Sequence, residues 1–389
     1  MNKLIYMDNA ATTAMTKEVV EAMLPFMTEK YGNPSSVYSL GSEARVAVEE
    51  ARESIANHLG AESKEIFFTG CGTESDNWAI KGTAYKLKDK GNHIITSKIE
   101  HHAVLHTCQY LEKQGFEVTY LDVDEDGVVD LEQLKNSIKE ETILITIMYA
   151  NNEIGTIQPI KEIGEIAKEK NILFHTDAVQ AVGHLNIDVK EENIDMLSLS
   201  AHKLHGPKGV GVLYIKKGVR IDNLLEGGAQ ERRKRAGTEN VAGIVGLAKA
   251  MDMAYDNLEE KNEKLISLRN KLINEIETRI DHVKLNGHRT KRLPGNVNIS
   301  FEFIEGESLL LSLDMMGIAA SSGSACTSGA LDPSHVLMAI GLTHEIAHGS
   351  LRLSRSEFNT EEETDYVVEQ LVTIVDRLRK MSPLYDKLV

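Results

Sequence analysis

The chain has 389 residues, of which 42% are hydrophobic and 26% charged, and its formal net charge is −16. This composition is typical of a globular protein with two or three domains, or one large domain and a smaller partner. The acidity argues against general binding to nucleic acids or anionic membranes. We find no apolar run long enough to predict a membrane-spanning helix and no recognisable targeting peptide, so we expect a cytoplasmic protein without a membrane anchor.

The cysteine content is low. Cys71, Cys108 and Cys326 are too few and too scattered for a disulfide framework. No CxxC pair predicts a structural zinc site. The remaining question is whether one of the three is a reactive thiol.

Residues 17–30 and 42–59 are predicted to form helices, the second capped by Ser42 and followed by Gly60, with Val46, Val48, Ile55 and Leu59 on one stripe. Strands then alternate with helices. The predicted strands cover 65–69, 93–97, 116–121, 142–147, 172–176, 194–199 and 209–215, and helices cover 73–89, 103–114 and the segment from Pro159 to Lys170. Apolar strands that alternate with helices predict a mostly parallel seven-stranded sheet between helices, an α/β domain.

The second part of the chain has a different pattern. Residues 241–279 are predicted to form one long helix or two joined ones. Strand-like runs over 296–301 and 350–354, a short apolar segment over 317–320, and helices over 306–316 and 361–381 indicate a smaller α+β domain. We expect a large domain over 15–260 and a small domain formed by 1–14 with 261–389.

Ligands of an open parallel sheet bind beyond the carboxyl ends of its strands. The segments that follow the predicted strands carry polar or glycine-rich motifs. These are Gly70–Asn77, Glu100–Ala103, Asn151–Gly155, Asp177–Gln180 and Ser200–Gly209. Gly72 and Thr73 open a helix whose N–H groups suit a phosphate. His101 could stack on an aromatic cofactor, and a buried Asp177 needs a cationic partner such as a pyridinium nitrogen.

Lys203 follows the sixth of these strands, and glycines and a proline after it prevent a helix. Lysine forms Schiff bases with carbonyl cofactors, including pyridoxal phosphate. An exposed lysine in a polar turn is the alternative if this segment is taken alone. However, five strand ends each offer a group that could bind the same phosphorylated pyridine aldehyde. This combination favours a cofactor site at Lys203 over an exposed lysine.

The motifs together resemble the NifS/IscS cysteine desulfurases, which are fold-type I enzymes similar to aspartate aminotransferase and dependent on pyridoxal 5′-phosphate. The resemblance extends from Asp8 to about Glu363. The segments that carry it are Asp8–Thr13, Gly72–Asn77, Glu100–His101, Asn151–Gly155, His175–Gln180, Ser200–Lys203, Arg235–Thr238 and Ser321–Cys326.

This resemblance implies roles for individual residues. Lys203 would bind the cofactor covalently, Asp177 the ring nitrogen and Gln180 the phenolic oxygen. His101 would stack on the ring and move protons. The phosphate would be held by Gly72, Thr73, Ser200 and His202, and by Thr238 of the neighbouring subunit in a homodimer. Asn152 and Arg352 would hold the carboxylate of L-cysteine.

Cys326 is the predicted nucleophile. It lies in a stretch of small polar residues, about 321–333, that predicts an exposed loop. The resemblance implies that its thiolate takes sulfur from L-cysteine, leaves L-alanine, and passes the sulfur to an iron–sulfur scaffold of the NifU/IscU type; Cys326 is also a candidate transient cluster ligand. Cys71, between two glycines, and Cys108, within a helix, are interpreted as packing residues.

Other functions stay open. A selenocysteine lyase or a sulfur donor for tRNA and cofactor thiolation would use the same fold. A protein that keeps the fold without the cofactor is disfavoured by the presence of Lys203, Asp177 and Cys326. A metal-binding protein is disfavoured because the 14 histidines show no HExxH or HxxxH spacing with a supporting carboxylate.

Overall fold

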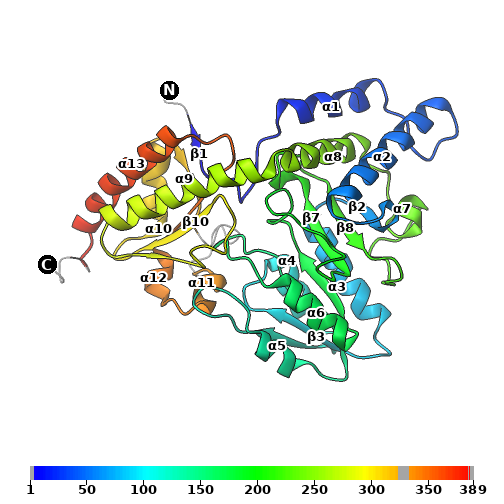
Figure 1. Ribbon diagram of the computed structural model, residues 1–389, viewed down its shortest axis with the longest axis horizontal. Helices are drawn as coiled ribbons and strands as arrows, with labels where there is room; N and C mark the ends of the chain where they lie inside the picture. Colours follow the sequence, from blue (N-terminus) through cyan, green and yellow to red (C-terminus); the bar gives the residue numbers. More distant parts are fainter. Residues whose placement is uncertain (1–3, 323–332, 384, 386–389) are drawn as a thin grey trace.

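The computed structural model describes residues 4–322, 333–383 and 385. Its larger part is a seven-stranded sheet in the order β2-β8-β7-β6-β5-β3-β4, in which only β8 runs antiparallel to its neighbours. The strands are β2 (Ile66–Thr69), β3 (His93–Ser97), β4 (Glu117–Leu121), β5 (Thr142–Thr146), β6 (Leu173–Asp177), β7 (Met196–Ser200) and β8 (Gly211–Ile215). The predicted α/β architecture is confirmed (Figure 1).

Helices cover both faces of this sheet because its strands are apolar on both sides. Ile95 and Ile145 belong to a core shared with α2, α6 and α8, whereas Ile94 and Leu144 pack with α3 and α4. The helices of this part are α1 (Lys17–Thr28), α2 (Ser39–His58), α3 (Gly72–Lys86), α4 (His102–Glu112), α5 (Leu131–Ser137), α6 (Ile160–Lys170), α7 (Gln230–Arg233) and α8 (Val241–Tyr255), with 3-10 turns η1 (Ser63–Glu65) and η2 (Ala201–Lys203).

The smaller part has its own core. Helices α9, α10 and α13 pack with β10 and β12, together with Ile5 of β1 and Met7, which follows that strand. Its elements are β1 (Ile5–Tyr6), α9 (Leu258–Arg279), β9 (Val283–Leu285), β10 (Asn296–Phe301), α10 (Gly306–Met315), β11 (Ile318–Ala319), α11 (His335–Ala339), α12 (His344–His348), β12 (Ser350–Ser354) and α13 (Glu361–Lys380). The domain bounds remain a prediction. The core around β10 and β12 is separate from that of the large sheet, but α11 and α12 pack with Ile99, Met148 and Ile154 of the larger part.

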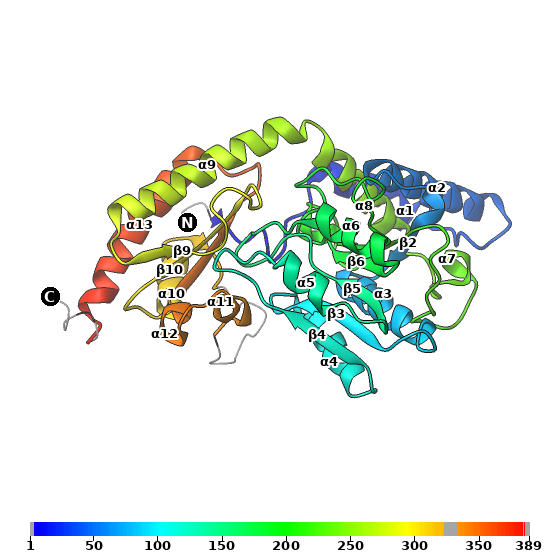
Figure 2. The ribbon, with the colours of Figure 1, turned by 60° about the horizontal axis from the view of Figure 1, so that its bottom comes forward.

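Helix α9 spans the two parts, with α13 beside it over the small antiparallel sheet β12-β10-β9 (Figures 1 and 2). The predicted long helical stretch is thus two helices, α8 and α9, separated at Asn257, which has a left-handed backbone with φ of 52°. Within the described residues, none of the helices is both long and apolar enough to span a membrane.

Two details of α2 were predicted wrongly. The helix begins at Ser39, so the cap is Tyr38 rather than Ser42. Val46 is 52% exposed while Val48 and Ile55 are buried. At about 100° per residue, Val46 lies about 200° around the helix from Val48 and therefore faces solvent. The predicted helix end at Gly60 is confirmed by its φ of +67°.

Candidate active site

The predicted strand-end residues meet around one cavity of about 340 Å³. It lies beyond the carboxyl ends of β6 and β7, which end at Asp177 and Ser200. Ten of the predicted site residues line it: Gly72, Thr73, His101, Asn152, Asp177, Gln180, Ser200, His202, Lys203 and Arg352. A cavity of this size suits a small cofactor with its substrate.

Lys203 ends the turn η2, directly after β7. Its Nζ atom donates hydrogen bonds to the carbonyl oxygens of Ala10 at 2.6 Å and Ala11 at 2.8 Å. Gln180 Nε2 donates to the same Ala10 oxygen at 3.0 Å. The segment after β1 therefore forms a wall of the site, a function that the sequence analysis did not assign to it.

Asp177 ends β6 and is 5% exposed. Its Oδ1 accepts a hydrogen bond from Val179 N at 2.9 Å. Burial raises the pKa of Asp177 to about 6, while Val179 and Lys203 act in the opposite direction. Such a carboxylate is stabilised by a cation placed in the cavity.

Two further buried carboxyl groups lie near Asp177. Burial and the proximity of Asp177 raise the pKa of Asp76, a residue of α3 that also lines the cavity. Burial raises the pKa of Glu100 to about 8, although Ser97 donates a hydrogen bond to it at 2.6 Å. Of the three carboxyl groups Asp76, Glu100 and Asp177, we therefore assign the negative charge at neutral pH to Asp177. Asp76 lies within the predicted segment Gly70–Asn77, but no role was predicted for it, because its burial depends on how α3 packs on the sheet.

His101 is the N-cap of α4, and its Nδ1 accepts a hydrogen bond from Ala103 N at 3.2 Å. The ring proton of the neutral side chain therefore resides on Nε2. Burial, with Lys203 and neighbouring histidines, lowers the pKa of His101 to about 4. At neutral pH this imidazole is therefore uncharged, with a proton on Nε2 that a bound group could accept.

The N-terminus of α3 faces the same cavity through Gly72 and Thr73. Its N-cap residue, Cys71, makes no side-chain capping bond. A Cβ atom at Gly72 would come within 2.6 Å of Val179, so this position needs glycine. First-turn N–H groups and a positive helix end are suited to a phosphate.

Arg352 lies in β12 and is 2% exposed. Its Nη2 forms an ion pair with Asp8 at 3.0 Å, and its Nη1 donates to the carbonyl oxygen of Asn152 at 3.0 Å. Among the described residues its buried Nε has no hydrogen-bond partner. The Arg352 guanidinium is thus held in place through Nη1 and Nη2, and its Nε–H remains as a donor suited to a carboxylate.

Cys326 lies outside the described residues, but both stems of its segment are described. Ser321 exchanges two backbone hydrogen bonds with Arg352, at 3.2 and 2.7 Å. On the other side, Ser334 donates to the carboxyl group of Glu153, at 2.5 Å. Cys326 is five positions after Ser321 in the sequence, so the chain length limits its Cα atom to at most roughly 16–18 Å from that stem.

The other predicted residues lie elsewhere. Thr238 is exposed and lines a separate hollow with Arg235 and Gly209. Cys71 lines the main cavity, whereas Cys108 is fully buried, and burial raises its pKa. Within the described part of the chain, no three His, Cys, Asp or Glu side chains are arranged to hold a metal ion.

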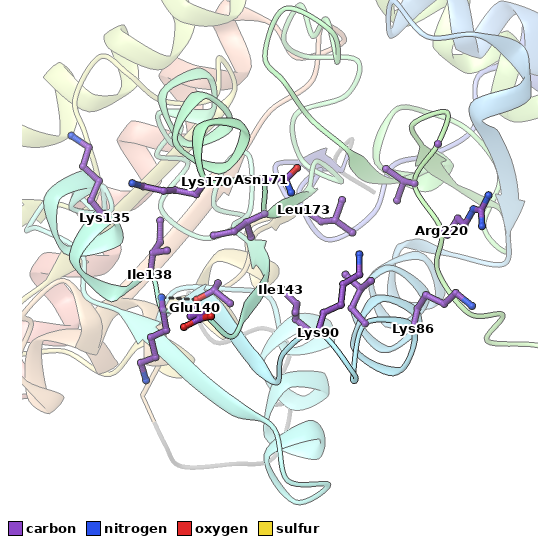
Figure 3. Close-up of a pocket in the computed structure, with 16 residues that line it drawn as sticks. Lys86, Lys90, Lys135, Ile138, Glu140, Ile143, Lys170, Asn171, Leu173 and Arg220 are labelled. Carbon is purple, nitrogen blue, oxygen red and sulfur yellow. Dashed lines mark hydrogen bonds between the residues drawn. The ribbon is translucent and has the colours of Figure 1, made fainter.

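A larger hollow, of about 890 Å³, lies at the opposite edge of the sheet, near the starts of β5 and β6 (Figure 3). It contains none of the predicted site residues. Lys86, Lys135 and Lys170 lie there in the last turns of α3, α5 and α6. Positive charge at these positions offsets the negative ends of the helix dipoles, so we interpret the lysines as structural.

Comparison with known proteins identifies the class of the chain. Residues 5–367 match the family model for class-V aminotransferases, and the chain belongs to this family. It is 64% identical over 388 residues to the cysteine desulfurase IscS of Clostridium botulinum strain Hall, with 99% of this chain and 98% of the relative covered. It is 63% identical over 386 residues to cysteine desulfurase IscS of Methanosarcina thermophila, with 99% and 95% covered.

Among solved structures, a NifS-like protein matches with a TM-score of 0.91 and 43% identity, covering 96% of this chain and 100% of that one. Within its family the chain therefore belongs to the cysteine desulfurases. The cofactor of these enzymes is pyridoxal 5′-phosphate, and the predicted fold type, enzyme class and cofactor are confirmed.

Proposed function

We propose that this protein converts L-cysteine to L-alanine and leaves the sulfur as a persulfide on Cys326. The observation that carries the proposal is the meeting of Lys203, Asp177, His101 and Arg352 in one cavity. The two described stems of the Cys326 segment are attached to Arg352 and Glu153 at this same place.

The residues present fit pyridoxal 5′-phosphate. Asp177 is a carboxyl group whose pKa burial raises despite the nearby Lys203, and the first turn of α3, which has no side-chain cap bond from Cys71, offers N–H groups for a phosphate. We propose that Lys203 binds the cofactor covalently and that the Asp177 carboxylate binds the nitrogen of its pyridine ring. Gln180 would face the phenolic oxygen, and Thr73, Ser200 and His202 would contact the phosphate. When bound, the cofactor supplies an electron sink for negative charge at the substrate Cα.

The substrate carboxylate would be held by Arg352 Nε and by Asn152. The carbonyl oxygens of Ala10 and Ala11 keep the Lys203 amine beside the cavity, where its uncharged form can take the Cα proton. The Cys326 thiolate then forms a bond to the substrate sulfur as the Cβ–S bond breaks. The electron pair of that bond stays with carbon, which is protonated to the methyl group of L-alanine.

We also propose a homodimer. A group of apolar side chains in the second half of α1 and in the segment that joins it to α2 is exposed: Leu24, Met27, Tyr31, Val37 (98%) and Tyr38. Such exposure on one stretch marks an interface. Thr238 does not line the cavity of its own chain, which is compatible with a role across that interface.

The sulfur acceptor is proposed to be an iron–sulfur scaffold of the NifU/IscU type. We place the reaction in the cytoplasm. The described cysteines, Cys71 and Cys108, are free thiols, as in proteins of reducing compartments.

The test is a comparison of two cysteine variants. Alanine release from L-cysteine in the presence of a thiol reductant should fall to background in Cys326→Ser and remain near the wild-type rate in Cys71→Ser. Mass spectrometry after a single turnover should show a 32 Da increase on the peptide with Cys326, about the mass of one sulfur atom. Wild-type activity in Cys326→Ser would overturn the assignment of the nucleophile.

A further inference from the structure

Glu153 connects three elements around the substrate site. It follows Asn152 in the loop after β5 and is 7% exposed. Its carbonyl oxygen accepts hydrogen bonds from two side chains of β10, Asn296 at 3.1 Å and Asn298 at 3.2 Å. Its carboxyl Oε2 accepts the hydroxyl of Ser334 at 2.5 Å. One residue thus joins the Asn152 loop, the small sheet and the chain before α11.

Ser334 is well placed to hold the start of α11. Its Oγ accepts the N–H groups of Val336 at 3.1 Å and Leu337 at 3.2 Å, so its own proton is available for Glu153. Val336 and Leu337 pack with Ile154, the residue after Glu153. Both polar and apolar contacts therefore fix the point at which the chain returns from the Cys326 segment.

Burial of the Glu153 carboxyl group costs desolvation free energy, which an apolar side chain that only filled this space would not cost. The charged groups that face Glu153 are Arg352 on β12, which attracts its negative charge, and beyond it Asp8, paired with Arg352. On α11 the neighbouring titratable group is His335, whose Nε2 contacts the carbonyl oxygen of Glu100. Burial raises the pKa of Glu153 to about 7, against the effects of Ser334 and Arg352.

We propose that Glu153 is a positioning residue for persulfide formation: through Ser334 it fixes the return end of the Cys326 segment beside Asn152 and Arg352. The inference rests on the proposed role of Cys326. The upstream end is already fixed by the backbone bonds between Ser321 and Arg352. One end is attached to Arg352 and the other to Glu153, the neighbour of Asn152, so both stems are held at or next to the residues assigned to the substrate carboxylate.

The test uses the holoenzyme with four variants and one control. Glu153→Ala and Ser334→Ala remove the connection, whereas Glu153→Gln and Ser334→Thr retain an acceptor and a hydroxyl. Thr343→Ala is the matched control, because Thr343 caps α12 through Ile346 N in the same way and makes no described contact with Glu153. Single-turnover persulfide formation is followed by quenched flow, and L-cysteine binding by the change in the cofactor absorption spectrum.

We expect Glu153→Ala and Ser334→Ala to slow persulfide formation at least tenfold, with L-cysteine affinity within about threefold of wild type. Glu153→Gln and Ser334→Thr should restore most of the rate. Equal rates in Ser334→Ala and Thr343→Ala would overturn the inference, as would parallel loss of affinity and rate. If Glu153→Ala does not fold, the persulfide formation rates of Ser334→Ala and Ser334→Thr test the inference by themselves.

A second measurement separates this inference from the proposed function. Alkylation of Cys326 by iodoacetamide, measured by peptide mass spectrometry without substrate, should change at least threefold in Ser334→Ala and not in Thr343→Ala. A wild-type enzyme that forms no persulfide on Cys326 would refute the proposed function. An unchanged alkylation rate in an enzyme that does form the persulfide would refute only the role of Glu153.

Discussion

Replacing Asp177 by asparagine should stabilise the protein without its cofactor and weaken cofactor binding. Asp177 is buried, and its pKa of about 6 exceeds the usual 3.8. This difference corresponds to about 3 kcal/mol in favour of the uncharged acid. Asparagine keeps an oxygen for the 2.9 Å hydrogen bond from Val179 N without the buried charge.

The sign of the pH dependence follows from the proton count. Between pH 3.8 and 6 the unfolded chain has lost the proton of this group while the folded apoprotein keeps it, so stability falls as the pH rises. Above about pH 6 the full cost of about 3 kcal/mol is present. The variant should thus gain up to this amount at pH 7.5, progressively less as the pH falls below about 6, and almost nothing below about 3.8.

Differential scanning fluorimetry of the apoprotein would measure the gain. For a chain of 389 residues the unfolding entropy is about 0.8 kcal/mol/K, so the expected increase in Tm is up to about 4 °C. Cofactor affinity should fall about 10–150-fold, the value of a lost hydrogen bond to a charged group. Asp188→Asn is the control, because Asp188 accepts the same kind of backbone bonds outside the cavity. A folded Asp177→Asn apoprotein with an unchanged or lower Tm at pH 7.5 would refute the reasoning.

Three further predictions concern the cofactor anchor, the substrate and the dimer. Lys203→Ala should abolish the visible absorption band of the bound cofactor, and a retained band would exclude Lys203 as the anchor. Arg352→Lys should raise the KM for L-cysteine about 10–150-fold, because the fixed guanidinium geometry is lost, and an unchanged KM in steady-state assays would contradict the carboxylate assignment. Val37→Glu should convert the proposed dimer into monomers in analytical ultracentrifugation and weaken cofactor retention, since Thr238 of the second chain would be absent; a stable dimer would place the interface elsewhere.

The sheet was predictable because its strands are short apolar runs between helical segments. The ends of β3, β10 and β12 agree with the predicted residues. The strand ends also identified the site, because the carboxyl ends of parallel strands lie at the same edge of the sheet. This holds independently of the conformation of the loops that follow them. Lys203 and Asp177, about 26 residues apart in the chain, reach the same cavity for this reason.

Other features depend on contacts that local patterns do not encode. Ala10 and Ala11 contact Lys203 across more than 190 residues of sequence, through backbone carbonyl groups that any residue type could supply. Asp76 lies within a helix, where only the packing of α3 on the sheet shows that its carboxyl group is buried. The neutral state of His101 similarly follows from burial and from the bond with Ala103, not from its residue type.

The two parts of the molecule contribute different halves of the site and are joined by several polar contacts. The large sheet supplies Lys203, Asp177 and His101, and the small sheet supplies Arg352. Asp8 binds Arg352 from the β1 segment, and Glu153 binds Ser334 and β10 from the large part. One stem of the Cys326 segment is fixed by Arg352 and the other by Glu153, the neighbour of Asn152. Each stem is therefore held at or next to a residue assigned to the substrate carboxylate, one from each part of the molecule.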